Sequence, residues 1–186
     1  SSRGALSETT AYIIPREQHD PLTTVKMINT LLKSGLEIKE AKKSFKAGPT
    51  VYPEGTFVIS LAQPKMGLIR NLLAQTHYPD NEWTRDRDGT PLRPYDLATH
   101  NMNEFMGVDV HPVQIDIEGD FEILSDFIAK PGKIDGGASV FRLDGRLNDC
   151  FRAVNLLLKR GIKVQRAVNA SGLKQGDFLI SGGKKS

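Results

Sequence analysis

The pattern of apolar and polar positions along the chain is the same in two places. Near the start, a short apolar run, 12–14, precedes a polar turn and a segment, 25–32, in which apolar residues recur every three or four positions. That spacing predicts a helix with one buried face. Near the end, Val140-Phe141 precedes a second segment of this kind, 153–158. Both parts therefore predict a strand that leads through a turn into an amphipathic helix.

The two parts also align residue by residue. Residues 28–41 and 154–167 share Asn, Leu, Leu, Lys, Gly and Ala in register, and three further positions exchange one apolar residue for another. A second match follows, because 55–60 and 176–181 both contain a Gly-x-Phe-apolar-Ile-Ser sequence. Matched segments in the same order predict an internal duplication of one supersecondary unit, with copies at 11–62 and 138–182.

Each copy is expected to contain a strand, a helix and a second strand. Gly35 and Gly161 come just after the helical patterns, where a left-handed residue ends a helix without steric cost. A short alternating strand follows each glycine, and a right-handed βαβ crossover would make the two strands of a copy parallel neighbours. We therefore predict an α/β fold, a three-layer Rossmann-like or flavodoxin-like sheet built from two duplicated βαβ units with a connecting helix and a long loop.

The rest of the pattern predicts smaller elements. Residues 1–10 are polar and are expected to be a linker, and 11–186 are expected to form a single domain. The segment 121–127 fits a strand or a helix equally well. The other expected elements are a hairpin arm within 42–53, a helix over 65–75 that buries Leu68, Ile69, Leu72 and Leu73, an irregular loop over 77–94, a short helix within 95–106 capped near Asp96, and a strand over 113–117.

The composition is that of an ordinary globular protein. Hydrophobic residues make up 39% and charged residues 25% of the chain, and the formal net charge is +3 with no long block of one sign. This balance favours neither nucleic acid nor a membrane as a partner. The longest apolar runs are far shorter than the roughly 20 residues that span a bilayer. The single cysteine excludes an internal disulfide.

Residue types that carry chemistry are present but scattered, so we predict no catalytic and no metal-binding residue. The four histidines lack the spacing of a helical zinc site. Asp86 and Asp88 lie in a sequence without the first and last ligands of a calcium loop, so a solvated turn is expected, with an adventitious ion left open. Neither first strand is followed by a glycine-rich phosphate loop, which disfavours dinucleotide binding. Cys150 lies inside a predicted helix between bulky residues, which favours a structural thiol over a nucleophile.

The long loop holds the candidate interface or binding residues. Aromatic and arginine side chains, which anchor many interfaces, gather in it. A solvated loop with one packed tryptophan is the alternative. The candidate residues are Tyr78, Trp83, Arg85, Arg87, Arg93 and Tyr95.

An ordered series of short motifs resembles a known family. The motifs are Ala11-Tyr12-Ile13-Ile14-Pro15-Arg16-Glu17-Gln18, Tyr52-Pro53-Glu54-Gly55-Thr56-Phe57-Val58-Ile59, Ala62-Gln63-Pro64, His77-Tyr78-Pro79-Asp80, Pro94-Tyr95-Asp96-Leu97 and Met106-Gly107-Val108. Over roughly 11–181, the chain resembles the region downstream of the catalytic domain in large bacterial zinc carboxypeptidases, exported relatives of carboxypeptidase A. In that group the peptidase domain is followed by α/β segments, some of which are similar to class I glutamine amidotransferases.

The resemblance implies a parent protein that uses zinc to remove C-terminal residues from peptides, and it implies export to the periplasm or the cell exterior. The zinc signature of the family, His-x-x-Glu with a distant histidine, has no counterpart in this chain. Zinc is therefore expected in the peptidase domain, with no cofactor here. The implied role is that of a non-catalytic accessory domain, with its own upstream peptidase domain as partner and a peptide substrate as a further one.

Two functions of other classes stay open. The two copies could form a periplasmic type of module that binds a small molecule or a peptide. The chain could also be an amidotransferase-like hydrolase that uses Cys150.

Overall fold

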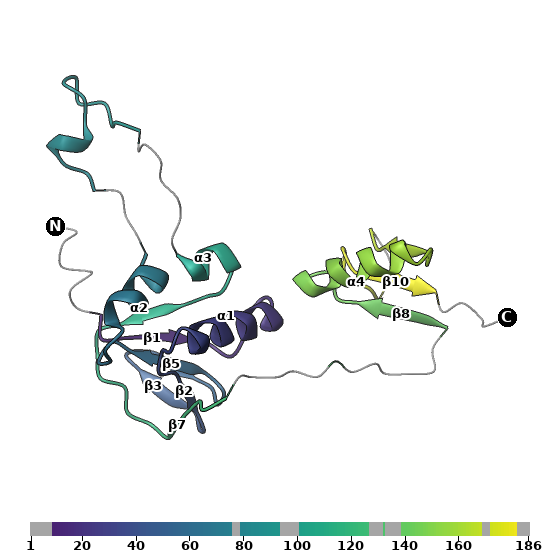
Figure 1. The fold of residues 1–186 in the computed structure, drawn as a ribbon, viewed down its shortest axis with the longest axis horizontal. Coiled ribbons are helices and arrows are strands. Elements are labelled where there is room, and N and C mark those ends of the chain that lie inside the picture. The colour runs from purple at the N-terminus through teal and green to yellow at the C-terminus, as the bar shows by residue number, and fades with distance from the viewer. Residues whose placement is uncertain are drawn as a thin grey trace.

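The computed structural model describes residues 9–75, 79–93, 101–126, 132, 139–168 and 172–181. It is a mixed α/β structure, and its described strands form a five-stranded sheet, a three-stranded sheet and a two-stranded hairpin (Figure 1). In chain order the elements are β1 (Ala11–Ile14), α1 (Pro21–Lys33), β2 (Lys39–Ala41), β3 (Phe45–Ala47), β4 (Thr50–Tyr52), β5 (Phe57–Ser60), α2 (Met66–Leu73), η1 (Glu82–Thr84), α3 (Met102–Met106), β6 (His111–Val113), β7 (Phe121–Ile123), β8 (Val140–Leu143), α4 (Asn148–Lys159), β9 (Val164–Arg166) and β10 (Phe178–Ser181).

We call β1, α1, β2 and β5 the N-terminal unit, and β8, α4, β9 and β10 the C-terminal unit. In the N-terminal unit, β5 lies between β1 and β2 and is antiparallel to both. In the C-terminal unit, β10 lies between β8 and β9 and is antiparallel to both. Each unit is thus a split βαβ motif with a third strand inserted. The predicted duplication has the same topology in both copies.

The registers of the two units also agree. Ser60 lies opposite Ala11, and Ser181 lies opposite Val140. The backbone bonds that close each unit repeat as well. The Ala41 amide donates to the Thr56 carbonyl at 2.9 Å and the Gly55 amide to the Ala41 carbonyl at 2.8 Å; the corresponding bonds, Ala167 to Asp177 and Gly176 to Ala167, measure 2.8 and 2.9 Å.

The prediction of parallel neighbouring strands is wrong. β1 and β2 run in the same direction, but β5 separates them, and every described strand pair is antiparallel. The central place of β5 follows from its sequence, because Phe57, Val58 and Ile59 are all buried and leave no polar face for solvent. The two units also build separate sheets, so their pairings do not form the single Rossmann-like or flavodoxin-like sheet that the repeat suggested.

Both helices end at the glycines that the repeat predicts. Asp20 caps α1, and Pro21 occupies its first turn, where a missing amide proton costs no hydrogen bond. Gly35 follows α1 with φ of 76°, and Gly161 follows α4 with φ of 74°. Both glycines therefore adopt the left-handed conformation that the sequence pattern predicts, at matching positions of the two units.

The two units differ in what covers them. All four residues of β1 are buried, because α1, α2 and α3 lie over one face of the five-stranded sheet and the β3–β4 hairpin packs on the other. No residue of β8 is buried. The buried core of the C-terminal unit consists, among the described residues, of Cys150, Val154 and Phe178. The hairpin arm is as predicted, and within the described residues the C-terminal unit has no counterpart of it.

The remaining elements follow the predictions with shifted bounds. In α2, Ile69 and Leu73 are buried, whereas Leu68 is exposed, contrary to the prediction that it faces the core. β6 is His111–Val113, so only Val113 of the predicted strand 113–117 lies in it; the pairing with β1 runs from Val113 opposite Ala11 to His111 opposite Ile13. The ambiguous segment is the strand β7. α3 begins after Asn101, whose side chain makes no capping hydrogen bond, and Asp96 lies outside the described residues.

The units touch where the N-termini of α1 and α4 meet (Figure 1). One oxygen of the buried Asp20 carboxylate accepts from the Leu22 and Thr23 amides at 3.0 Å. The other accepts from the Asn148 amide of α4 at 2.8 Å. Burial alone would raise the pKa of Asp20, but these hydrogen bonds outweigh it and hold the pKa below its ordinary value. One carboxylate thus caps two helices.

Candidate functional site

The segment 79–93, which we call the knob, comes between α2 and α3 in the chain and stands apart from the sheets in Figure 1. Its two sides pair as a small hairpin. The Leu92 amide donates to the Thr84 carbonyl at 2.9 Å, and the Asp86 amide donates to the Thr90 carbonyl at 2.8 Å. Gly89 turns the chain with φ of 83°. The irregular loop that the sequence predicts is therefore a compact, internally bonded structure.

A capping box fixes the start of the knob. The Trp83 amide donates to the Asn81 side-chain oxygen at 2.9 Å, and the Asn81 amide donates to the Thr84 hydroxyl at 2.9 Å. Two orphan amides of the short helix η1 are thereby satisfied. This arrangement sets the direction of the backbone at Trp83 without help from the sheets.

A forked ion pair closes the base of the knob. The Arg85 guanidinium donates to the two oxygens of Asp80 at 2.7 and 2.9 Å, and its third nitrogen donates to the Gly89 carbonyl at 2.8 Å. The hydrogen bond and the charge of Arg85 lower the pKa of Asp80, and Asp80 in turn raises the pKa of Arg85. Arg85 is therefore occupied within the knob and positions the loop.

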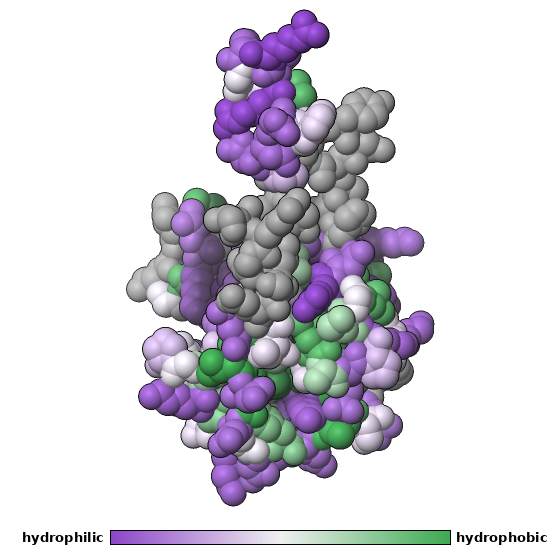
Figure 2. Space-filling model, turned by 90° about the vertical axis from the view of Figure 1, so that its left-hand side faces the viewer, coloured by the Kyte–Doolittle hydropathy of each residue, from purple (hydrophilic) through white to green (hydrophobic). Residues whose placement is uncertain are grey.

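Trp83 is the most prominent side chain of the knob, with 83% of its surface exposed. The tryptophan is therefore not packed, whereas the choice between an interface and a solvated loop stays a prediction. Figure 2 shows that the surface of the knob is mostly hydrophilic. Among the other predicted interface residues, Arg87 and Arg93 are exposed on the same segment, and Tyr78 and Tyr95 lie outside the described residues. A rigid aromatic side chain on a preorganised loop is the type of group that anchors a protein interface.

The acidic pair in the knob forms a turn. Asp86 accepts from the Arg87 amide at 2.7 Å, and Asp88 accepts from the Thr90 amide at 2.9 Å. Hydrogen bonds from Thr90 lower the pKa of Asp88. Within the described residues, no group of three or more His, Cys, Asp or Glu side chains is placed to hold a metal ion. Two histidines, His77 and His100, lie outside those residues.

Cys150 is buried in the first turn of α4, as the sequence predicts. Burial raises the pKa of its thiol, and the nearby acidic residues Asp144 and Asp149 raise it further. The thiol is therefore protonated at neutral pH. A thiol nucleophile needs the opposite environment, with a pKa lowered by a cation or a base.

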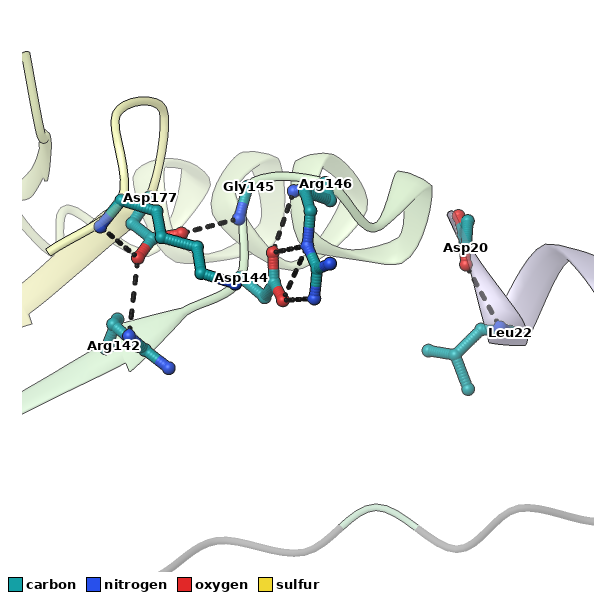
Figure 3. A network of polar contacts seen from close by, with 8 residues as sticks. Asp20, Leu22, Arg142, Asp144, Gly145, Arg146 and Asp177 are labelled. Atoms are coloured by element: carbon teal, nitrogen blue, oxygen red, sulfur yellow. Dashed lines mark hydrogen bonds and ion pairs between the residues drawn. The ribbon is translucent and has the colours of Figure 1, made fainter. Parts of the chain in front are cut away.

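A buried carboxylate that the sequence reasoning missed organises the C-terminal unit (Figure 3). Asp177 accepts from the Gly145 and Lys174 amides at 3.2 Å, and the Arg142 guanidinium lies 3.6 Å away. A Cβ on Gly145 would lie 2.0 Å from the Gly176 carbonyl oxygen, so the two turns meet at van der Waals limits. In the alignment of the two copies, Asp177 corresponds to Thr56. A carboxylate in one copy at a position that is uncharged in the other is a signal that could have pointed to Asp177.

Two hollows could admit a small ligand. One, of about 340 Å³, lies beside the start of α1 and is lined by residues that include Arg16, Glu40 and Lys42. The other, of about 470 Å³, lies beside the end of α1 and is lined by residues that include Leu36 and Leu124. In the first hollow, the charges are of both signs, and Asp20 already occupies the helix N-terminus, so the site lacks a net attraction for an anion.

No protein-family model, curated protein or solved structure matches this chain. Among the helices of the described segments, none is both long and apolar enough to cross a membrane.

Proposed function

We propose that this chain is a non-catalytic accessory domain of a secreted zinc carboxypeptidase-like metallopeptidase. In this proposal the domain supports the peptidase domain or its substrate cleft, and the parent protein acts in the periplasm or outside the cell. The zinc ion and the catalytic residues belong to the peptidase domain. The order of motifs along the chain, from Ala11-Tyr12 to Met106-Gly107, is the basis for the family, and the knob is the basis for the role.

One observation carries the role: Trp83 is 83% exposed on a loop that its own hydrogen bonds hold in shape. An exposed indole costs solvation free energy when it has no partner, whereas a preorganised loop loses little entropy on binding. A loop that is held by its own hydrogen bonds is expected to keep its conformation when it binds a partner. The knob is therefore the surface that we assign to the contact with the peptidase domain.

The first test is the reading frame that encodes this chain. The proposal expects the His-x-x-Glu zinc signature and a distant histidine upstream of the region described here. A frame with no peptidase signature would remove the family assignment, whatever the knob binds.

The second test uses Trp83, the only tryptophan of the chain. With 5-fluorotryptophan in its place, titration with the separately produced peptidase domain should shift the fluorine resonance. Trp83→Ala should weaken the association by tenfold or more, roughly the effect of losing a hot-spot aromatic. Val51→Ala, which truncates an exposed residue of the β3–β4 hairpin, is the matched control and should leave the association unchanged. An unshifted resonance at saturating peptidase domain would show that the knob is not the contact.

A further inference from the structure

The outer edge of β9 is open in the part of the chain that the structure describes. Among the described strands, β9 pairs with β10 alone, whereas its counterpart β2 pairs with β5 on one side and with β7 on the other. We call the outward backbone of residues 164–168 the β9 edge. Gln165, Arg166 and Val168 on it are exposed. The same unit therefore has a filled edge in one copy and an open edge in the other.

In the N-terminal unit, the pairing of β7 with β2 shows which backbone groups an added strand would use. The Leu124 amide donates to the Ile38 carbonyl at 2.9 Å, and the Lys42 amide donates to the Asp120 carbonyl at 2.8 Å. By the register of the repeat, the corresponding groups of the β9 edge are the Val164 carbonyl and the Val168 amide. Open edges of this kind are templates for an incoming strand.

Charge indicates what kind of strand fits. Residues 109–126, which supply both β6 and β7, contain six acidic residues and no lysine or arginine. Lysines that follow β2 hold this acidic segment: Lys42 forms ion pairs with Glu122 and Glu40, and Lys43 lies 3.1 Å from Asp120. Residues 139–181, which contain the C-terminal unit, carry eight basic and three acidic residues. Of these basic residues, Arg166 lies on the β9 edge and Lys163 directly precedes it.

One residue difference between the two units also favours an acidic strand. Glu40 of β2 lies opposite Glu122 of β7, which is an unfavourable pair of like charges that Lys42 offsets. The residue at the place of Glu40 in the C-terminal unit is Arg166, whose guanidinium lies over the Phe178 ring at 5.6 Å. An acidic residue opposite Arg166 would form a favourable cross-strand pair without an auxiliary lysine.

We propose that the β9 edge binds an extended acidic peptide segment, which adds to the three-stranded sheet as an antiparallel strand. The peptide places a carboxylate opposite Arg166 and a larger apolar side chain opposite Ala167, as Phe121 lies opposite Ala41. A second copy of this chain fits less well, because its C-terminal unit has the same positive charge. The proposal goes beyond the accessory role and does not depend on it, since that role concerns the knob.

The test uses a synthetic peptide with the sequence of residues 116–126, the segment that contains β7. Titration of the 15N-labelled chain with this peptide should give saturable shifts of the Val164, Arg166 and Val168 amides. A peptide with lysine in place of each of its acidic residues should not bind. Because the attraction is electrostatic, raising the salt from roughly 50 to 500 mM should weaken the binding.

Two matched variants in one strand test the role of Arg166. Arg166→Gln and Gln165→Glu each change the net charge by the same amount, but the backbone groups of Gln165 face β10. Arg166→Gln should weaken the binding about three- to fivefold, the effect of losing one cross-strand ion pair, and Arg166→Lys should restore most of it. Gln165→Glu should have a smaller effect.

Three outcomes would overturn the proposal. One is equal binding of the acidic and the lysine-substituted peptides. Another is shifts confined to Glu40 and Lys42, whose amides face β7, which would mean that the peptide only displaces β7. The third is concentration-dependent self-association of the free chain, with shifts at Val168, which would assign the edge to a second copy.

Discussion

The N-terminal and C-terminal units have the same strand order, register and glycine conformations, yet one is buried and the other is largely exposed. The difference is visible at single positions. Ile13 of β1 is fully buried under the β3–β4 hairpin, and the residue in the same register of β8 is the exposed Arg142. The comparison shows that turns and register specify the topology of this unit, whereas the elements added around it decide how much of it is buried.

The largest expected effect comes from exchanging these two residues. Ile13→Arg places an unpaired charge in the core and should destabilise the N-terminal unit by more than about 4 kcal/mol. Arg142→Ile should cost about 1 kcal/mol or less, because Arg142 is exposed and loses only its contact with Asp177. Loss of dispersion in the NMR spectrum, confined to the N-terminal unit of the first variant, is the readout. A well-folded Ile13→Arg protein would mean that the hairpin does not seal that face.

The second comparison uses the same residue in both units. Ile59 is fully buried at the centre of β5, and Ile180 is half-buried at the matching position of β10. Ile59→Ala should cost about 2–5 kcal/mol in the free energy of unfolding, as truncations in packed cores do. Ile180→Ala should cost less than half as much. Chemical denaturation with a probe in each unit measures both values, and equal costs would contradict the difference in burial.

The third comparison concerns conformation and should give matched effects. Gly35→Ala and Gly161→Ala should each cost about 1 kcal/mol, because a Cβ is strained at positive φ. Gly35 has an additional neighbour, the flexible end of Lys65, which can move. Gly89 also has positive φ, so Gly89→Ala should carry similar strain within the knob. If neither Gly35→Ala nor Gly161→Ala changes the midpoint of chemical denaturation, the left-handed conformation at these two turns is not required for the stability of the units.

The smallest expected effect is a dependence on pH at the contact between the units. The pKa of Asp20 is lowered in the folded chain, so its contribution to stability is present above the ordinary carboxyl pKa. That contribution is lost as pH falls through the folded-state value. The Asn148 amide, which donates to Asp20, should therefore lose protection from hydrogen exchange only at acidic pH. Loss of protection near neutral pH would point to another group.

The sequence was sufficient to predict the repeat, the helix ends and the hairpin, because these depend on local signals such as the apolar spacing of α1 and the glycine after it. The order of the strands was not predictable in the same way. It depends on a return strand, β5, that fits between β1 and β2, and periodicity alone does not distinguish neighbours from strands with an inserted partner. The exposure of Trp83 also had no signal in the sequence, since it depends on whether anything packs over the knob.

The central claim is that the two units are equivalent in hydrogen bonding and unequal in burial. Amide hydrogen exchange at Ile59 and Ile180 tests it most directly, because each residue lies in a strand that has a partner strand on both sides. The account predicts that the Ile180 amide exchanges about 100-fold faster or more, since its unit opens at a lower free energy. Equal protection of the two amides would contradict it.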